Sequence, residues 1–306
     1  MRNGDSPLFL VAAIVALVAV FGATTEYFFS ATTFRTVVSQ IPDAVVIAVG
    51  MTFVLIVGGI DLSVGSVLAL SAAAFGGALL AGWPVPLAAV LCLCAGLICG
   101  ALNATVIVAW RVPSFIVTLG MLEMARGAAY LATGSQTQYL GGRLGRLESA
   151  SVLGLPWPFA LAIALVVAGQ FVLARTVFGR HAIAIGANED AARLSGVDPR
   201  PIRFAVFSMA GVLASVGAMM QAARLASADP NAGSGFELRA IAAVVIGGTS
   251  LMGGRGSVVR SFFGVIIMAV LASGLAQAGV QEPTKRLITG AVIVGAVVLD
   301  RYRART

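Results

Sequence analysis

Charged residues are scarce in this sequence: they make up 11% of its 306 residues, whereas 59% are hydrophobic. Soluble domains carry about 25% charged residues, so the composition excludes an ordinary soluble protein. The apolar runs are about 17–25 residues long, which is enough to cross a bilayer as helices. Alternating segments of about 10 residues, typical of a transmembrane barrel, are absent. We predict an all-α, polytopic integral membrane protein with about ten transmembrane helices.

Residues suited to catalysis are also few. The only lysine, Lys285, follows QEPT rather than the glycine-rich run of a phosphate loop, so we do not expect the chain to hydrolyse ATP itself. The only histidine, His181, has no motif that places a serine against it, which argues against a Ser/His/Asp set. A membrane protease needs two intramembrane aspartates, and Asp61 is the one candidate. We predict no catalytic residues.

The three cysteines, Cys92, Cys94 and Cys99, fall in one apolar run. Cys92 and Cys94 point to different faces of a helix, which argues against both a disulfide and a metal site. We expect all three to act as small buried hydrophobic residues, and we expect no metal and no cofactor.

The basic excess, a net charge of +7, is spread over loops and helix ends. A nucleic-acid-binding protein would gather its basic residues in one stripe or tail, so we expect no nucleic-acid partner. The positive-inside rule explains the distribution better. We predict a multi-pass membrane protein, with both termini and residues 178–203 in the cytoplasm.

Two glycine-rich stretches interrupt the apolar pattern. GGIDLSVGS (residues 58–66) separates the apolar runs 41–57 and 67–81, and GGTSLMGGRGS (247–257) precedes the run 258–279. Broken backbone inside a membrane is tolerated only where protein or a water-filled cavity satisfies it. We therefore predict broken helices at both stretches. The two stretches also resemble each other, which indicates an internal repeat of the kind that transporters carry around a central site.

A few polar residues lie within the apolar zone and are candidates for a substrate pathway: Asp61, Ser63, Asn103, Ser114, Thr118, Glu123 and Arg126. Each has a structural alternative. Asp61 or Ser63 can cap the following helix, which for Asp61 is the interpretation we favour. Glu123 and Arg126 are neighbours at i, i+3, and we favour a structural ion pair. The remaining hydroxyl and amide groups are equally suited to joining helices.

The most polar stretch, residues 178–203, contains a predicted short helix over residues 189–195. Asn188 is suited to the N-cap, Glu189 and Asp190 suit the positive end of a helix, and Gly196 is suited to end it. The residues Asp190-Ala191-Ala192-Arg193-Leu194-Ser195-Gly196 match the D/E-A-A-x-x-x-G pattern of the cytoplasmic loop in ABC importer permeases, with Asp in place of the usual Glu.

Four further segments carry the same likeness. They are GGIDLSVGSVLALSA, the NATV run at Asn103, VPSFIVTLGMLEMARG, and AIAAVVIGGTSLMGGRGSVVRSFFGVII. With the IGANEDAARLSGVD loop they resemble the ribose/xylose/arabinose-type branch of bacterial sugar ABC permeases, over residues 41–299.

The resemblance implies one permease domain, residues 1–306, that moves a monosaccharide or related polyol into the cytoplasm by alternating access. It implies a homodimer in the lipid bilayer of the bacterial inner membrane. It also implies cytoplasmic ATP-binding subunits and a periplasmic sugar-binding protein received by the outer loops 134–156 and 227–235. Contact with the ATPase is expected at Glu189, Asp190, Ala191, Ala192, Arg193 and Gly196. The rival hypotheses are an ion-coupled secondary sugar transporter and, less favoured, an intramembrane enzyme.

Overall fold

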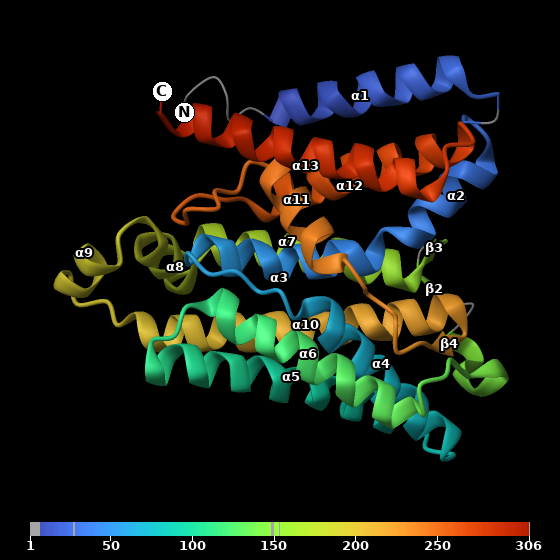
Figure 1. Ribbon diagram of the computed structural model, residues 1–306, viewed down its shortest axis with the longest axis horizontal. Helices are drawn as coiled ribbons and strands as arrows, with labels where there is room; N and C mark the ends of the chain where they lie inside the picture. The colour runs from blue at the N-terminus through green and yellow to red at the C-terminus, as the bar shows by residue number, and fades with distance from the viewer. Residues whose placement is uncertain (1–6, 27, 148–149, 153, 306) are drawn as a thin grey trace.

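The computed structural model describes residues 7–305 apart from 27, 148–149 and 153. Most of its long helices lie along one long axis, while α2 and α11 run obliquely to it (Figure 1). They are α1 (Pro7–Thr24), α2 (Ala31–Gln40), α3 (Pro42–Ile56), α4 (Val64–Leu80), α5 (Val85–Trp110), α6 (Ser114–Thr133), α7 (Trp157–Arg175), α8 (Val177–Ala187), α9 (Glu189–Leu194), α10 (Pro199–Leu225), α11 (Phe236–Ile246), α12 (Val258–Gln277) and α13 (Glu282–Arg305). A 3₁₀ helix, η1 (Gly141–Leu147), and two-residue strands complete the described chain.

The helices have the length and composition of membrane spans. Five of them, α5, α6, α7, α10 and α12, are long and apolar enough to cross a bilayer. The pair α2 and α3, bent by 41°, makes a sixth when it is counted as one span. The helices α1 and α4 are apolar but shorter. The expected all-α polytopic membrane fold is confirmed, while these criteria recover five or six of the roughly ten predicted spans in the described residues.

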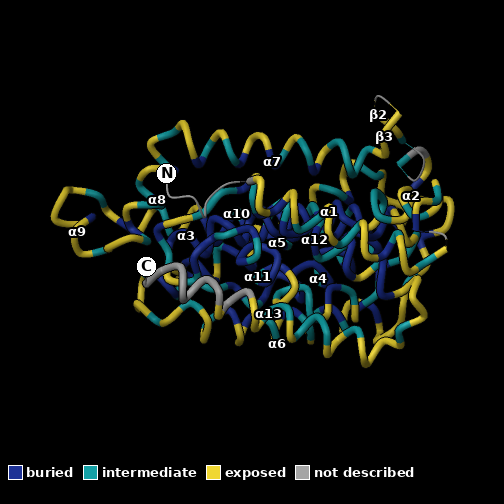
Figure 2. Tube along the Cα trace, turned by 90° about the horizontal axis from the view of Figure 1, so that it is seen from above, coloured by how far each residue is buried: buried dark blue, intermediate teal, exposed yellow. Residues whose placement is uncertain are grey.

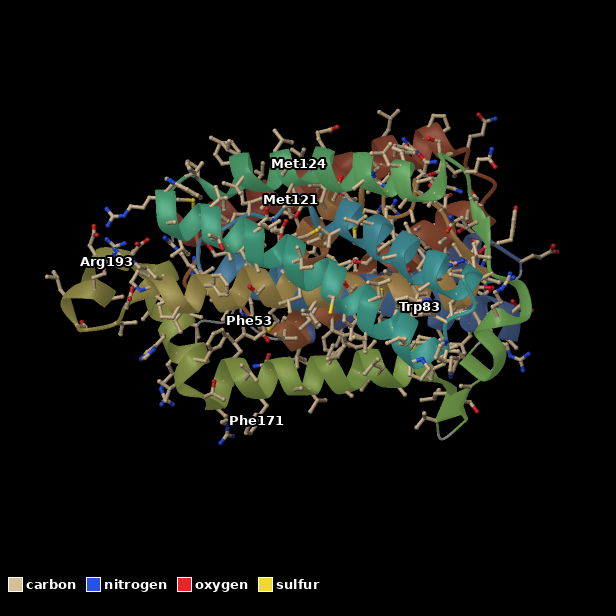
Figure 3. All side chains as sticks on the ribbon, turned by 90° about the horizontal axis from the view of Figure 1, so that it is seen from below. Phe53, Trp83, Met121, Met124, Phe171 and Arg193 are labelled. Atoms are coloured by element: carbon tan, nitrogen blue, oxygen red, sulfur yellow. The ribbon has the colours of Figure 1, made fainter. Side chains whose placement is uncertain are left out.

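The core of the molecule is built around α3 and α10. Almost every residue of α3 is buried, and one face of α10 packs against α3, α4 and α5. Figure 2 shows this buried centre, with exposed residues along α7 and on the ends. Outward-facing apolar side chains such as Met124 on α6 and Phe171 on α7 suit contact with lipid (Figure 3). Of the cysteines, Cys92 and Cys99 are buried as expected, but Cys94 is exposed.

The two ends of the molecule differ. One end, here called the α9 end, holds α8 and α9, the start of α1 and the end of α13 (Figure 1). The opposite end, here called the β end, holds the strands: β1 (Gln138–Tyr139) pairs antiparallel with β4 (Ser227–Ala228), and β2 (Ser151–Val152) pairs with β3 (Leu155–Pro156). The loops predicted to lie together outside therefore do meet at one end.

Two half-length helices begin near the middle of the molecule and run in opposite directions (Figure 1). After α3, residues 57–63, here called the first break, lead back from the α9 end to the start of α4, which runs to the β end. After α10, residues 226–235, here called the re-entrant segment, lead back from the β end to the start of α11, which runs to the α9 end. A broken helix is thus confirmed at residues 58–66, whereas the second break lies at the re-entrant segment and not at residues 247–257 as predicted. The two breaks stand in an inverted arrangement typical of transporters.

The expected equivalence between residues 58–66 and 247–257 is wrong. In chain order, the first break corresponds to the re-entrant segment, and residues 247–257, which follow a half helix, correspond to the turn after α4. The likeness of the two glycine stretches has a local cause. Gly58 (φ +74°) and Gly248 (φ +83°) end their helices in the same left-handed cap, with Gly59 N–H donating to Val54 O and Thr249 N–H donating to Val244 O.

Candidate functional site

The first break carries a buried polar cluster in the centre of the molecule. Asp61 Oδ1 accepts hydrogen bonds from Ser63 N–H (2.8 Å) and from the Ser63 hydroxyl (2.6 Å). The amide of Asn103, on α5, donates to Ser63 Oγ at 3.0 Å. These side chains are at most 2% exposed, and no cationic group lies within ion-pair distance of Asp61 among the described residues.

This geometry corrects the expected helix cap. Ser63 does occupy the position before the first turn of α4, but its side chain accepts no hydrogen bond from the free N–H groups of that turn. Asp61 instead closes a local turn with Ser63, one residue before α4 begins. Because Asp61 and Ser63 hydrogen-bond each other, neither side chain caps the free amides at the start of α4.

Two hydroxyl groups on α6 hold the backbone of the first break. Ser114 Oγ accepts from Ile60 N–H at 2.9 Å. Thr118 Oγ1 accepts from Leu62 N–H at 3.1 Å and donates to Ile60 O at 3.2 Å. The structure therefore brings Asp61, Ser63, Asn103, Ser114 and Thr118 together. In these contacts Ser114 and Thr118 join helices, which is the structural alternative that the sequence left open.

The expected ion pair between Glu123 and Arg126 is wrong. Arg126 donates to two carbonyl oxygens of the re-entrant segment, Pro230 O (2.5 Å) and Ala232 O (2.8 Å), while Glu123 is exposed. The i, i+3 spacing places the two side chains on one face, but the carbonyl groups of another segment satisfy the guanidinium. Arg126 therefore fastens the segment that leads into α11.

Sequence reasoning missed the contact between the two half helices. A Cβ atom on Gly65, in the first turn of α4, would lie 2.2 Å from Gly233 O and 2.7 Å from Glu237 Oε2, in the first turn of α11. The positive ends of two helix dipoles thus meet beside the Asp61 cluster. Ser66 Oγ, also in the first turn of α4, and Asn103 Oδ1 are buried without a hydrogen-bond partner in the described structure.

An ion pair on a buried carboxylate was also missed. Asp43, at the start of α3, is 3% exposed at its side chain and lies 3.0 Å from the Arg224 guanidinium at the end of α10. The pair fastens the two core helices to each other where α10 turns into the re-entrant segment. Nothing in the local sequence signals it, because the partners are 181 residues apart.

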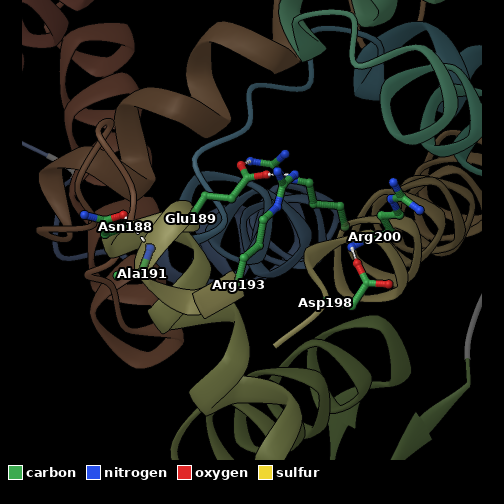
Figure 4. A network of polar contacts seen from close by, with 7 residues as sticks. Asn188, Glu189, Ala191, Arg193, Asp198 and Arg200 are labelled. Atoms are coloured by element: carbon green, nitrogen blue, oxygen red, sulfur yellow. Dashed lines mark hydrogen bonds and ion pairs between the residues drawn. The ribbon is translucent and has the colours of Figure 1, made fainter. Parts of the chain in front are cut away.

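The second candidate region is the short helix α9 at the α9 end (Figure 4). Asn188 Oδ1 caps it by accepting from Ala191 N–H at 3.0 Å, as predicted, and the helix covers residues Glu189–Leu194. The Glu189 carboxylate pairs with Arg193 on the same helix and with Arg203 on α10. Gly196, at φ +85°, ends the turn in a left-handed conformation that favours glycine.

The surface of α9 is open to a partner. Leu194 is 91% exposed, and Asp190 and Arg193 are also exposed, whereas Ala192 is buried against the rest of the chain. Figure 3 shows Arg193 at this end of the molecule, far from Trp83 near the β end. Because Glu189 binds arginines on two elements, the helix is held in a fixed orientation while its apolar and charged outer side stays uncovered.

Metal-ligating side chains do not gather among the described residues. No group of three or more His, Cys, Asp or Glu side chains lies close enough together to hold a metal ion in the part of the chain that the structure describes. The polar groups at the first break are hydroxyls, an amide and one carboxylate, which are suited to hydrogen-bonding hydroxylated molecules.

Comparison with known proteins places the chain in a family. Residues 33–297 match the family described as "Branched-chain amino acid transport system / permease component". The chain belongs to this permease family. The ribose import permease protein RbsC of Escherichia coli K12 is 36% identical over 298 residues, covering 95% of this chain and 92% of that protein. RbsC of Bacillus subtilis 168 is 39% identical over 261 residues, covering 84% and 81%.

A third relative is named for a different sugar. The xylose transport system permease protein XylH of E. coli K12 is 35% identical over an alignment of 361 residues, covering 97% of this chain and 92% of that protein. No solved structure matches the chain. The resemblance to ribose- and xylose-type permeases that the motifs indicate is confirmed over nearly the whole chain.

Proposed function

We propose that the chain is the membrane-spanning subunit of an ABC importer that moves a monosaccharide, or a related polyol, into the cytoplasm. The observation that carries the proposal is α9, a capped and doubly ion-paired six-residue helix with an uncovered outer side, at one end of a polytopic permease. The similarity to ribose and xylose permeases supports a sugar as substrate.

In this proposal α9, here called the docking helix, receives force from a cytoplasmic ATP-binding subunit. Leu194 enters an apolar pocket of the partner, while Asp190 and Arg193 contribute charged contacts around it. Ala191 and Ala192 keep the helix slim, Glu189 fixes its orientation, and Gly196 lets the chain turn back to α10. The α9 end is then cytoplasmic, and both chain termini are cytoplasmic with it.

The substrate passes through the centre of the molecule. Asp61, Ser63 and Asn103 supply hydrogen-bonding groups at the meeting point of α4 and α11, while Ser114, Thr118 and Arg126 hold the two returning segments in place. Glu123 is assigned no role beyond the surface of α6. Alternating access follows from rocking the two inverted halves around this point.

The remaining partners follow from this orientation. The β end faces the periplasm, where the paired strands β1 and β4 join the loops expected to receive a sugar-binding protein. A second copy of the chain completes a homodimer in the bilayer, and the whole described chain acts as one permease domain.

The rival with a specific observation in its favour is an ion-coupled sugar transporter. A buried carboxylate without a cation partner in the described structure, Asp61, is the kind of group that carries protons or sodium ions in such proteins. In the ABC importer, Asp61 instead accepts hydrogen bonds from Ser63 and from sugar hydroxyls.

Uptake by proteoliposomes separates the two. The chain is reconstituted with its ATP-binding subunit and sugar-binding protein, and labelled sugar is followed with and without internal ATP. We expect uptake to require ATP and to persist after ionophores collapse the proton and sodium gradients. Gradient-driven accumulation by the chain without the ATP-binding subunit would contradict the proposal.

A further inference from the structure

Three segments that are far apart in the sequence touch through their backbones at the α9 end. They are the end of α3 with the start of the first break (Ile56 and Gly58), the end of α8 (Gly186 and Ala187), and the loop 247–257 (Gly253 and Gly254). We call this contact the glycine junction. Gly254 N–H donates to Ile56 O at 2.9 Å, which joins the loop to α3 directly.

The contact leaves no room for a side chain at Gly186, Gly253 or Gly254. A Cβ atom on Gly186 would lie 1.7 Å from Ile56 O and 2.5 Å from Gly254 N. One on Gly253 would lie 2.7 Å from Gly186 O and 3.1 Å from the Gly58 Cα atom. Such close-packed backbone transmits displacement instead of absorbing it, because no flexible side chain lies between the segments.

The junction also lies directly between α9 and the first break. Asn188, the N-cap of α9, follows Ala187, so one residue separates the docking helix from the junction. On the other side, the first break begins at Val57, and Asp61 is five residues beyond Ile56. A second contact supports α3 against α8 at this end: the rings of Phe53 and Phe178 lie 6.3 Å apart between centroids.

We propose that the glycine junction makes α8, α9 and the end of α3 one rigid unit that transmits movement of α9 to the first break. When the ATP-binding partner displaces α9, the unit shifts the first break against α6, where Ser114 and Thr118 hold it. The hydrogen bonds of Ile60 and Leu62 to α6 then open. The cluster of Asp61, Ser63 and Asn103 opens with them. Gly186, Gly253 and Gly254 are positioning residues for transport in this mechanism, which rests on the proposed function.

A purely structural role predicts something different. If the junction only holds the loop 247–257 in place, α8 is free to move relative to α3 during transport, and the first break stays fixed to α6 throughout the cycle. The two roles therefore make opposite predictions about which contacts persist and which must open.

Two covalent tethers test these predictions in the reconstituted importer. The native cysteines are first replaced with serine or alanine. One tether links Phe53→Cys to Phe178→Cys, across the rigid unit, and the other links Ile60→Cys to Ser114→Cys, across the contact that must open, with the same short bifunctional thiol reagent. We expect the first tether to leave ATP-driven uptake within about twofold and the second to lower it at least about tenfold, the size of a typical coupling.

The outcomes are decisive in each case. Loss of uptake with the Phe53–Phe178 tether, or normal uptake with the Ile60–Ser114 tether, overturns the proposed role of the glycine junction. The proposed function still stands in that case if the cysteine-free parent shows ATP-driven uptake. If the parent is driven by an ion gradient, the proposed function fails, and the junction fails with it because no partner displaces α9.

A helix glycine supplies a matched substitution. Gly186→Ala places a methyl group against Ile56 O, whereas Gly127→Ala on α6 meets no atom within 4 Å. We expect Gly186→Ala to keep the ATP-binding subunit bound and hydrolysing ATP while the sugar transported per ATP falls, and Gly127→Ala to match the parent. A parental sugar-to-ATP ratio in Gly186→Ala contradicts the proposal.

Discussion

The ion pair between Asp43 and Arg224 allows a quantitative prediction. The Asp43 side chain is 3% exposed, and its carboxylate also accepts a hydrogen bond from Ala44 N–H at 2.9 Å. Replacing Arg224 with methionine leaves a buried carboxylate without its cation. Loss of one partner from a buried pair costs about 3–5 kcal/mol of folding free energy. We expect about 3 kcal/mol, the lower limit, because the Arg224 side chain is 26% exposed and water reaches the site.

A double variant isolates the interaction energy between the Asp43 and Arg224 side chains. Asp43→Asn removes the buried charge, so Asp43→Asn/Arg224→Met is expected to recover at least about 1.5 kcal/mol relative to the sum of the single variants. The free energy of unfolding is measured reversibly in bicelles by steric trapping. Arg143→Met, which replaces an exposed arginine at the same end of the molecule, is the control and is expected to stay within about 0.5 kcal/mol of the parent. A coupling energy below about 0.5 kcal/mol refutes the role given to the pair.

Three further predictions concern the centre and the docking helix. Asp61→Ala leaves the Ser63 N–H and hydroxyl without their acceptor and is expected to lower the unfolding free energy by about 2 kcal/mol. Asp61→Asn keeps Oδ1 and is expected to lower it by less than about 1 kcal/mol. Equal losses in the two variants would mean that the acceptor is irrelevant. Gly65→Ala should destabilise the protein by about 1–3 kcal/mol through overpacking against Gly233 O, while Gly77→Ala, in the same helix with open space around it, should be neutral or stabilising in the same unfolding assay. Gly196→Ala forces a non-glycine residue to φ +85° and is expected to cost about 1–2 kcal/mol, read out as faster proteolysis near α9; unchanged cleavage contradicts the left-handed cap.

Local signals in the sequence were sufficient where a helix is bounded by its own residues. The bounds of α6, Ser114–Thr133, follow from its own flanking residues, because Pro113 precedes the helix and Gly134 ends it. The predicted docking helix ends one residue later than α9, and its cap at Asn188 and stop at Gly196 are confirmed. Capping chemistry acts within a few residues, so the sequence carries it directly.

Contacts between distant segments could not be predicted in the same way. The i, i+3 spacing of Glu123 and Arg126 indicated a pair, but the carbonyl groups of Pro230 and Ala232 are the partners of Arg126. The supposed repeat compared two glycine caps that share local geometry and occupy different places in the fold. The meeting of Gly65 with Gly233, and the glycine junction, depend on the packing of helices that the sequence separates widely.

The docking helix is the part of the proposed function that one measurement tests most directly. Sugar transported per ATP hydrolysed is measured in the reconstituted importer for Asp190→Lys and Gly196→Trp. Both changes alter the outer side or the end of α9 and leave the central cluster untouched. We predict that both variants retain the fold and lose most of the coupling, so that ATP is hydrolysed with little uptake. Parental coupling in both variants would contradict the proposal that the ATP-binding partner drives transport through α9.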